Sequence, residues 1–99
     1  MIINLNLEDK KIIVVGGGNE AEKRIKSLLN EKCEIIVISD SITEQISKWV
    51  KTKQIKLKKQ KIENMKFISE IKPDLIITTT NNKKINQKII NHAKKKKII

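Results

Sequence analysis

Apolar residues along this chain follow two spacings, one typical of strands and one typical of helices. Short apolar runs bounded by polar residues or glycine indicate strands in the following segments: residues 12–15, 34–39, 54–59 and 74–79. Three of these are apolar throughout their centres, as expected for strands covered on both faces in a parallel sheet. In residues 54–59, Ile55 and Leu57 alternate with lysines, which predicts an edge strand with one wet face.

Between the strands, apolar residues gather on one face of a helix. The spacing i, i+4, i+7, i+8 predicts two helices, with these residues on the buried face: Ala21, Ile25, Leu28 and Leu29 within residues 19–31, then Ile42, Ile46, Trp49 and Val50. A short helix with Met65, Ile68 and Ile71 ends before Pro73, and a last helix carries Ile85, Ile89, Ile90 and Ala93. Ser41 or Thr43 can cap the second helix.

The alternation of strands and helices predicts an α/β fold with a doubly wound, parallel, Rossmann-like sheet. Right-handed crossovers place the one-sided strand outermost and give the strand order 3-2-1-4. Ile98 and Ile99 fit the start of a fifth strand. A length of 99 residues predicts one domain, residues 1–99.

The first strand runs directly into three glycines, and a helical pattern begins immediately afterwards. The spacing Gly16-x-Gly18-x-x-Ala21 fits the G-x-G-x-x-G/A fingerprint of dinucleotide-binding domains. Gly16 permits a tight turn, Gly18 lets a pyrophosphate approach the backbone, and Ala21 keeps the helix close to the strand. We expect a phosphate group at the helix N-terminus. The alternative is a glycine turn without a ligand.

Two acidic residues flank this turn. Asp40 ends the second strand about 20 residues after the glycines, where a carboxylate commonly accepts a hydrogen bond from a ribose 2′-OH. That carboxylate would repel a 2′-phosphate, so it favours NAD over NADP; the alternative role is a helix cap. Glu20 suits a helix N-terminus but competes with a phosphate there, so we expect it to point to solvent and cofactor affinity to be modest.

Other polar residues carry weaker predictions. The segment Thr78-Thr79-Thr80-Asn81-Asn82 offers neutral hydrogen-bonding groups at the same edge of the sheet, either to the cofactor or substrate or to cap the last helix. His92 and Cys33 are interpreted as packing or surface residues. The sequence contains no Ser/His/Asp set, no metal-ligand cluster and no P-loop lysine, so it predicts neither a catalytic residue nor a metal site.

The chain is strongly basic, with a formal net charge of +11. Nucleic-acid binding is one explanation, but such modules interleave arginines and aromatics with their lysines, and here they are limited to Arg24, Trp49 and Phe67. A bias toward Lys, Ile and Asn explains the charge more simply. No apolar run reaches the roughly 20 residues of a membrane span, and the N-terminus lacks a signal-peptide pattern. We therefore expect a cytoplasmic protein that binds neither nucleic acid nor membrane.

Several segments together carry a resemblance to a known family. They are Asn6-Leu7-Glu8-Asp9-Lys10-Lys11, Ile12-Ile13-Val14-Val15-Gly16-Gly17-Gly18, Ala21-Glu22-Lys23-Arg24, and Thr79-Thr80-Asn81-Asn82 with Ile85-Asn86. They look like the N-terminal domain of sirohaem synthases, which are precorrin-2 dehydrogenases and in some cases also sirohydrochlorin ferrochelatases. The resemblance implies an NAD-binding Rossmann domain that oxidises precorrin-2, a tetrapyrrole, to sirohydrochlorin with hydride transfer to NAD⁺. It also implies a homodimer when full length.

The resemblance further implies where the cofactor is bound. Together with the polar segment after the fourth strand, it gives these cofactor-binding residues: Gly16, Gly17, Gly18, Asn19, Glu20, Asp40, Ser41, Thr79 and Thr80. Glu20 stands where the family usually has valine, and Asp40 where it often has a small residue. The family's catalytic aspartate follows a fifth strand and lies beyond residue 99, so we expect a fragment or a reduced member without the chemistry. A different class, a non-catalytic NAD- or nucleotide-binding sensor domain, is the alternative.

Overall fold

Four parallel strands form a single sheet in the order β3-β2-β1-β4. The computed structural model describes residues 8–61 and 65–95. Its elements are β1 (Lys11–Val15), α1 (Asn19–Leu28), the 3-10 turn η1 (Leu29–Glu31), β2 (Glu34–Ser39), α2 (Glu44–Lys51), β3 (Lys56–Lys59), α3 (Lys66–Ile71), β4 (Leu75–Thr78) and α4 (Lys83–Lys95). The predicted α/β class and strand order are confirmed. Ile98 and Ile99 lie outside the described residues, so the fifth strand stays a prediction.

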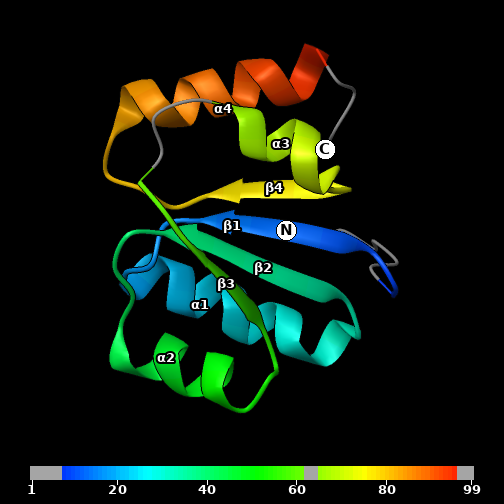
Figure 1. Ribbon diagram of the computed structural model, residues 1–99, viewed down its shortest axis with the longest axis vertical. Coiled ribbons are helices and arrows are strands. Elements are labelled where there is room, and N and C mark those ends of the chain that lie inside the picture. Colours follow the sequence, from blue (N-terminus) through cyan, green and yellow to red (C-terminus); the bar gives the residue numbers. More distant parts are fainter. Residues whose placement is uncertain (1–7, 62–64, 96–99) are drawn as a thin grey trace.

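Helices cover both faces of the sheet, with α1 and α2 on one side and α3 and α4 on the other (Figure 1). Successive side chains of a strand point to opposite faces, so a strand buried on both sides must be apolar at every position. In β1, Ile12 and Val14 belong to the core under α1 and α2, whereas Ile13 and Val15 belong to the core under α3 and α4. All four are fully buried.

The β3 strand lies at the edge of the sheet, as its alternating sequence predicts. It is shorter than expected, because Ile55 is buried but precedes the residues that pair with β2. Two of its lysines form ion pairs, Lys56 with Glu34 at 2.8 Å and Lys58 with Glu70 at 2.9 Å. The hydrogen bond from Lys56 lowers the pKa of the Glu34 carboxyl below its ordinary value.

The helices begin and end at recognisable caps. The Thr43 hydroxyl accepts a hydrogen bond from the Ile46 amide at 3.3 Å, so Thr43 rather than Ser41 caps α2. Helix α3 ends at Ile71, followed by Lys72 in the left-handed region (φ 55°) just before Pro73. Among the described residues, none of the helices is long and apolar enough to cross a membrane.

Trp49 and Cys33 are packing residues, as expected. Both are half-buried and lie against the core beneath α1 and α2. Burial raises the pKa of the Cys33 thiol, and its sulfur lies 3.6 Å from the Leu28 carbonyl oxygen as a weak donor. Both side chains therefore stabilise this layer through contacts with the apolar core.

Two adjacent isoleucines on α4 provide a test of this layer packing. Ile89 is fully buried and Ile90 is 40% exposed. Replacing Ile89 by alanine should cost roughly 2–5 kcal/mol of unfolding free energy, because the removed atoms leave a cavity. Replacing Ile90 by alanine should change it by about 0.5 kcal/mol or less. Urea denaturation monitored by circular dichroism measures both, and equal losses would contradict the assigned layering.

Candidate functional site

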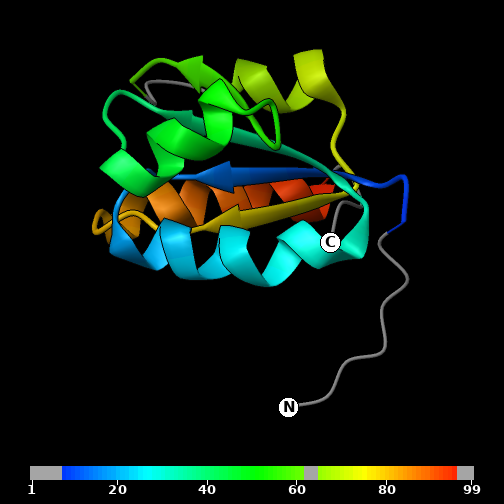
Figure 2. The ribbon, with the colours of Figure 1, turned by 90° about the horizontal axis from the view of Figure 1, so that it is seen from below.

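The strand order reverses between β1 and β4, and the loops after both strands lie at the same edge of the sheet (Figure 2). β2 and β3 end at this edge too, because all four strands are parallel. In open α/β sheets, ligands bind outside the carboxyl ends of the strands at such a reversal. The glycine turn therefore occupies the position expected for a binding site.

Gly16 forms the tight turn that the sequence predicts. Its φ is +116°, a conformation that residues with a side chain rarely adopt. An added Cβ would also overlap the Thr79 hydroxyl oxygen. That hydroxyl donates to the Val15 carbonyl oxygen at 2.8 Å, and the Thr79 amide donates to the same oxygen at 2.9 Å. The loop after β4 is thus pressed directly against the turn.

Gly17 has an intramolecular role that the fingerprint does not predict. A Cβ at this position would overlap the Ser41 carbonyl oxygen and lie 2.9 Å from the Ser39 hydroxyl oxygen. The Gly17 carbonyl oxygen accepts a hydrogen bond from the Thr43 amide at 3.0 Å. Gly17 therefore lets the loop between β2 and α2 pack against the turn, and its expected role in cofactor binding stays a prediction.

Gly18 is free of such constraints. Its φ of −93° is accessible to any residue, and an added Cβ would meet nothing within 4 Å. It is the N-cap of α1, yet no side chain caps this helix, so the first amide groups lack an intrahelical or side-chain acceptor. Ala21 in the first turn is fully buried, which keeps the helix close to the sheet. The geometry leaves open space beside free donors, as an incoming phosphate requires.

Asn19 and Glu20 are exposed at the start of α1. The Glu20 carboxylate pairs with Arg24 one turn along the helix, with 3.4 Å between Oε1 and Nε. Both side chains are more than half exposed, so the expected solvent-facing position of Glu20 is observed. Arg24 partly offsets the negative charge that Glu20 places near the helix N-terminus.

The end of β2 turns Asp40 outward. The buried Ser39 hydroxyl donates to the Ser41 carbonyl oxygen at 2.6 Å and accepts from the Ser41 amide at 3.3 Å, which closes a tight turn around Asp40. Asp40 is exposed, and its carboxylate has no partner among the described residues. Because Thr43 caps α2, the alternative role of Asp40 as a helix cap is wrong. Its carboxylate is available to a ligand.

The loop after β4 is held by hydrogen bonds within the chain. The Thr80 hydroxyl donates to the Asn86 side-chain oxygen, and the Asn86 amide nitrogen donates back to the Thr80 carbonyl oxygen at 2.9 Å. Asn82 accepts from the Ile85 amide at 3.1 Å and so caps α4. Of the two roles predicted for this segment, capping belongs to Asn82, whereas Thr80 is positioned at the site.

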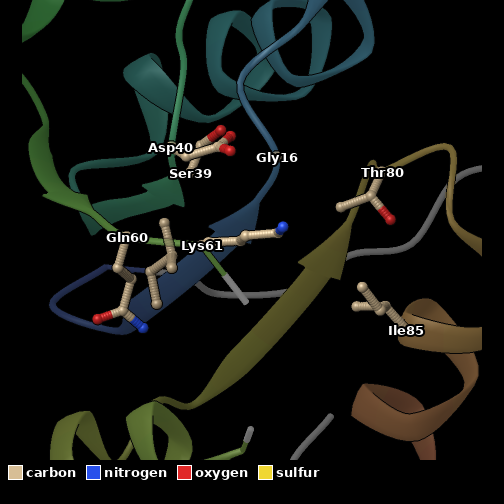
Figure 3. Close-up of a pocket in the computed structure, with 8 residues that line it drawn as sticks. Gly16, Ser39, Asp40, Gln60, Lys61, Thr80 and Ile85 are labelled. Atoms are coloured by element: carbon tan, nitrogen blue, oxygen red, sulfur yellow. The ribbon is translucent and has the colours of Figure 1, made fainter. Parts of the chain in front are cut away.

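A pocket of about 160 Å³ lies between these loops. Its lining residues are Gly16, Ile38, Ser39, Asp40, Gln60, Lys61, Thr80 and Ile85. Figure 3 shows that they come from the ends of all four strands and the start of α4. Sites for whole small molecules typically measure about 300–1,000 Å³, so this pocket fits only part of a dinucleotide.

Gln60 and Lys61 are pocket residues that the sequence interpretation missed. They directly follow β3, and the Gln60 amide donates to the Ser39 carbonyl oxygen at 3.1 Å. The signal that could have found them is the parallel sheet itself, since residues just after every strand reach the same edge. His92 does not line the pocket; it is half-buried on α4, and its Nε2 has no partner among the described residues.

Comparisons with known proteins identify the family and relatives of this chain. A family model described as "Putative NAD(P)-binding" matches residues 3–99. The precorrin-2 dehydrogenase of Bacillus subtilis (strain 168) is 29% identical over 91 residues, covering 92% of this chain and 54% of that protein. The siroheme synthase of Baumannia cicadellinicola is 31% identical over 93 residues, covering 94% of this chain and 20% of that protein.

A solved structure of "SirC, precorrin-2 dehydrogenase" superposes with a TM-score of 0.79 at 28% identity, covering 88% of this chain and 42% of that chain. These matches confirm the predicted fold and the resemblance to the N-terminal domain of sirohaem synthases. The expected NAD cofactor agrees with the NAD(P)-binding description of the matching family. The chain spans about half the length of the precorrin-2 dehydrogenases it matches.

The adjacent glycines Gly17 and Gly18 separate folding from ligand binding. Gly17→Ala should lower the unfolding free energy by roughly 1–3 kcal/mol, because its methyl group meets fixed backbone. Gly18→Ala should change the unfolding free energy by less than about 1 kcal/mol, because the added methyl group meets open space. Alanine is a poorer N-cap than glycine, but it also makes the unfolded chain less flexible, and these two effects on stability oppose each other.

Among variants that remain folded, we expect Gly18→Ala to weaken NAD⁺ binding more than Gly17→Ala does. If Gly18 provides room for the cofactor, Gly18→Ala should weaken NAD⁺ binding about tenfold or more, since its Cβ would occupy the space left for a phosphate. Thermal unfolding and NAD⁺ titration of each variant measure the two effects. Unchanged NAD⁺ affinity in Gly18→Ala would show that the open space beside α1 is not the phosphate site.

Proposed function

This chain belongs to the NAD(P)-binding family that matches residues 3–99, and we propose that it is the cofactor domain of a precorrin-2 dehydrogenase of sirohaem biosynthesis. In the proposed reaction, precorrin-2 is oxidised to sirohydrochlorin while NAD⁺ accepts a hydride and a proton is released. The named relatives support this assignment, and the chain aligns with them over most of its own length. Because it spans about half of those proteins, the activity of the whole protein is part of the proposal.

The observation that carries the proposal is the open position at Gly18. Gly16 and Gly17 are glycines because the chain itself packs against them, but nothing in the described chain requires glycine at position 18. An uncapped helix N-terminus beside that open position supplies amide donors for an anion. A glycine that the fold does not need, placed beside free amide donors, is well explained by the close approach of a dinucleotide phosphate.

The residues present fit a dinucleotide in defined roles. The amides at the start of α1 would bind the diphosphate, with Gly18 leaving room for it. The Asp40 carboxylate would accept a hydrogen bond from the adenosine ribose, and Thr80 would contact the cofactor from the loop after β4. Asn86 would keep Thr80 in place through their paired hydrogen bonds. The other predicted contacts, Gly16, Gly17, Asn19, Glu20, Ser41 and Thr79, stay in the proposal as residues that surround the turn.

The proposal has further parts that rest on the family resemblance and the sequence. They are an anionic tetrapyrrole substrate, a homodimer of the whole protein, and a cytoplasmic location. Catalysis is assigned to none of the described residues. The resemblance instead assigns it to an aspartate after a fifth strand, beyond residue 99. The described residues are proposed to supply the cofactor site.

Asp40 should determine the choice between NAD⁺ and NADP⁺. Asp40→Ala removes an acceptor for the ribose 2′-OH, so NAD⁺ affinity should fall about tenfold or more, in the range of a hydrogen bond to a charged group. NADP⁺ affinity should fall less or rise, because the repulsion of its 2′-phosphate is lost. Titration calorimetry with both cofactors measures the difference.

Glu44→Ala is the matched control for Asp40→Ala. Glu44 is an exposed carboxylate in the first turn of α2, just after the Asp40 loop, and it does not line the pocket. The control should leave the ratio of NAD⁺ to NADP⁺ affinity unchanged. If Asp40→Ala weakens both cofactors equally, Asp40 does not contact the ribose 2′ position.

The enzymatic part of the proposal is tested with precorrin-2 and NAD⁺ under anaerobic conditions. The full product of the gene that encodes this chain should form NADH and sirohydrochlorin, followed by absorbance. The 99-residue chain should bind NAD⁺ even where it forms no NADH. Cofactor binding without NADH formation by the full gene product would favour the alternative, a non-catalytic nucleotide-binding or sensor domain.

A further inference from the structure

The pocket carries one acidic and one basic side chain, and the two are not paired with each other. Asp40 enters it from the end of β2 and Lys61 from the end of β3. Within the described part of the chain, neither charge has an ion-pair or hydrogen-bond partner. A pocket with both an acceptor and a cation suits a ligand that presents hydroxyl donors and an anionic group.

Lys61 differs from Lys56 and Lys58, which precede it in β3, because it lines the pocket and they do not. Lys56 and Lys58 reach carboxylates on neighbouring elements, at 2.8 Å from Glu34 and 2.9 Å from Glu70. Those pairs neutralise the charges of these two lysines, whereas Lys59, the third lysine of β3, is exposed. Lys61 follows the strand, lines the pocket, and keeps its positive charge unneutralised by the described residues. Its charge is therefore available to an anionic ligand.

The Lys61 side chain extends toward the ends of β1 and β4. Figure 3 shows its ammonium nitrogen on the side of the pocket where Gly16 and Thr80 lie. This is the side at which α1 begins, three residues beyond Gly16. The ammonium group thus points to the region where the glycine turn leaves room for phosphates, while Asp40 borders the pocket from the end of β2.

We propose that Lys61 is a cofactor-binding residue that recognises the diphosphate of the dinucleotide. The inference rests on the proposed NAD binding. Within one pocket, Asp40 recognises the ribose and Lys61 recognises the negative charge of the diphosphate. A diphosphate carries about two negative charges, while a helix N-terminus provides only about half a positive charge. Glu20 lowers the potential there further, and Arg24 offsets it only in part. A mobile lysine supplies the missing positive charge.

The experiment compares ligands that contain the diphosphate, ADP-ribose and NAD⁺, with adenosine, which does not. Lys61→Met keeps much of the side-chain volume and removes the charge. It should weaken binding of ADP-ribose and NAD⁺ about three- to tenfold, as expected for a solvent-accessible charge-assisted contact. Adenosine, which has the ribose but no phosphate, should change less than about twofold. Lys61→Arg should retain most of the ADP-ribose affinity, because it keeps the charge.

The control is Lys51→Met, which removes an exposed lysine from the last turn of α2, outside the pocket. It should leave the affinity for all three ligands unchanged. The affinity of the unaltered chain for ADP-ribose should also fall more steeply with salt than that of Lys61→Met, because one charge contact is absent in the variant. Thermal unfolding checks that both variants are folded.

Three results would overturn the proposed role of Lys61. An equal loss of adenosine and ADP-ribose would show that Lys61 shapes the pocket without recognising phosphate. A loss confined to NADP⁺ would place the ammonium group at the 2′-phosphate rather than the diphosphate. If the unaltered chain bound neither NAD⁺ nor ADP-ribose, the proposed function itself would fail. That outcome is distinct from normal binding that Lys61→Met leaves unchanged, which would reject the role of Lys61 alone.

Discussion

The close backbone contacts at Gly16 and Gly17 are the constraint on which the rest of this site depends. The loop after β4 packs against Gly16, and the loop after β2 packs against Gly17, with no space for a side chain in either place. Hydrogen bonds secure both contacts, from Thr79 to the Val15 carbonyl oxygen and from Thr43 to the Gly17 carbonyl oxygen. Three loops thereby form one rigid rim at the carboxyl edge of the sheet.

The three consecutive glycines at this rim have two different roles. The first two glycines serve the chain, because its own loops occupy the space where their side chains would be. At the third, no part of the described chain occupies the space of a side chain, which leaves a gap at the N-terminus of α1. The charges follow a similar division. Lys56 and Lys58 of β3 pair with carboxylates of the fold, whereas Asp40 and Lys61 face the pocket without partners among the described residues.

The fold could be predicted almost entirely from sequence, because local patterns determine it. Apolar residues at every position identify the covered strands, and the lysines beside Leu57 identify β3 as the edge. The roles of Gly16 and the location of Asp40 followed from spacing. The role of Gly17 did not, since it depends on a carbonyl oxygen 24 residues later in the chain, at Ser41. Lys61 was missed because its position depends on where β3 stops. The sequence left Ser41 and Thr43 open as caps of α2, and the choice of Thr43 depends on where the helix begins.

The double hydrogen bond from Thr79 to Val15 also has a consequence for folding order. It joins residues 64 positions apart, so the rim is complete only after β4 has added to a sheet begun by β1 and β2. Contacts of such long sequence separation form late, after the entropy of closing the intervening loop has been overcome. When β4 is not paired with β1, the loops after β1 and β2 can form their part of the rim, but the loop after β4 cannot. Nucleotide affinity would then measure whether this last folding step is complete. Bound cofactor would stabilise the state in which β4 is paired with β1, by mass action.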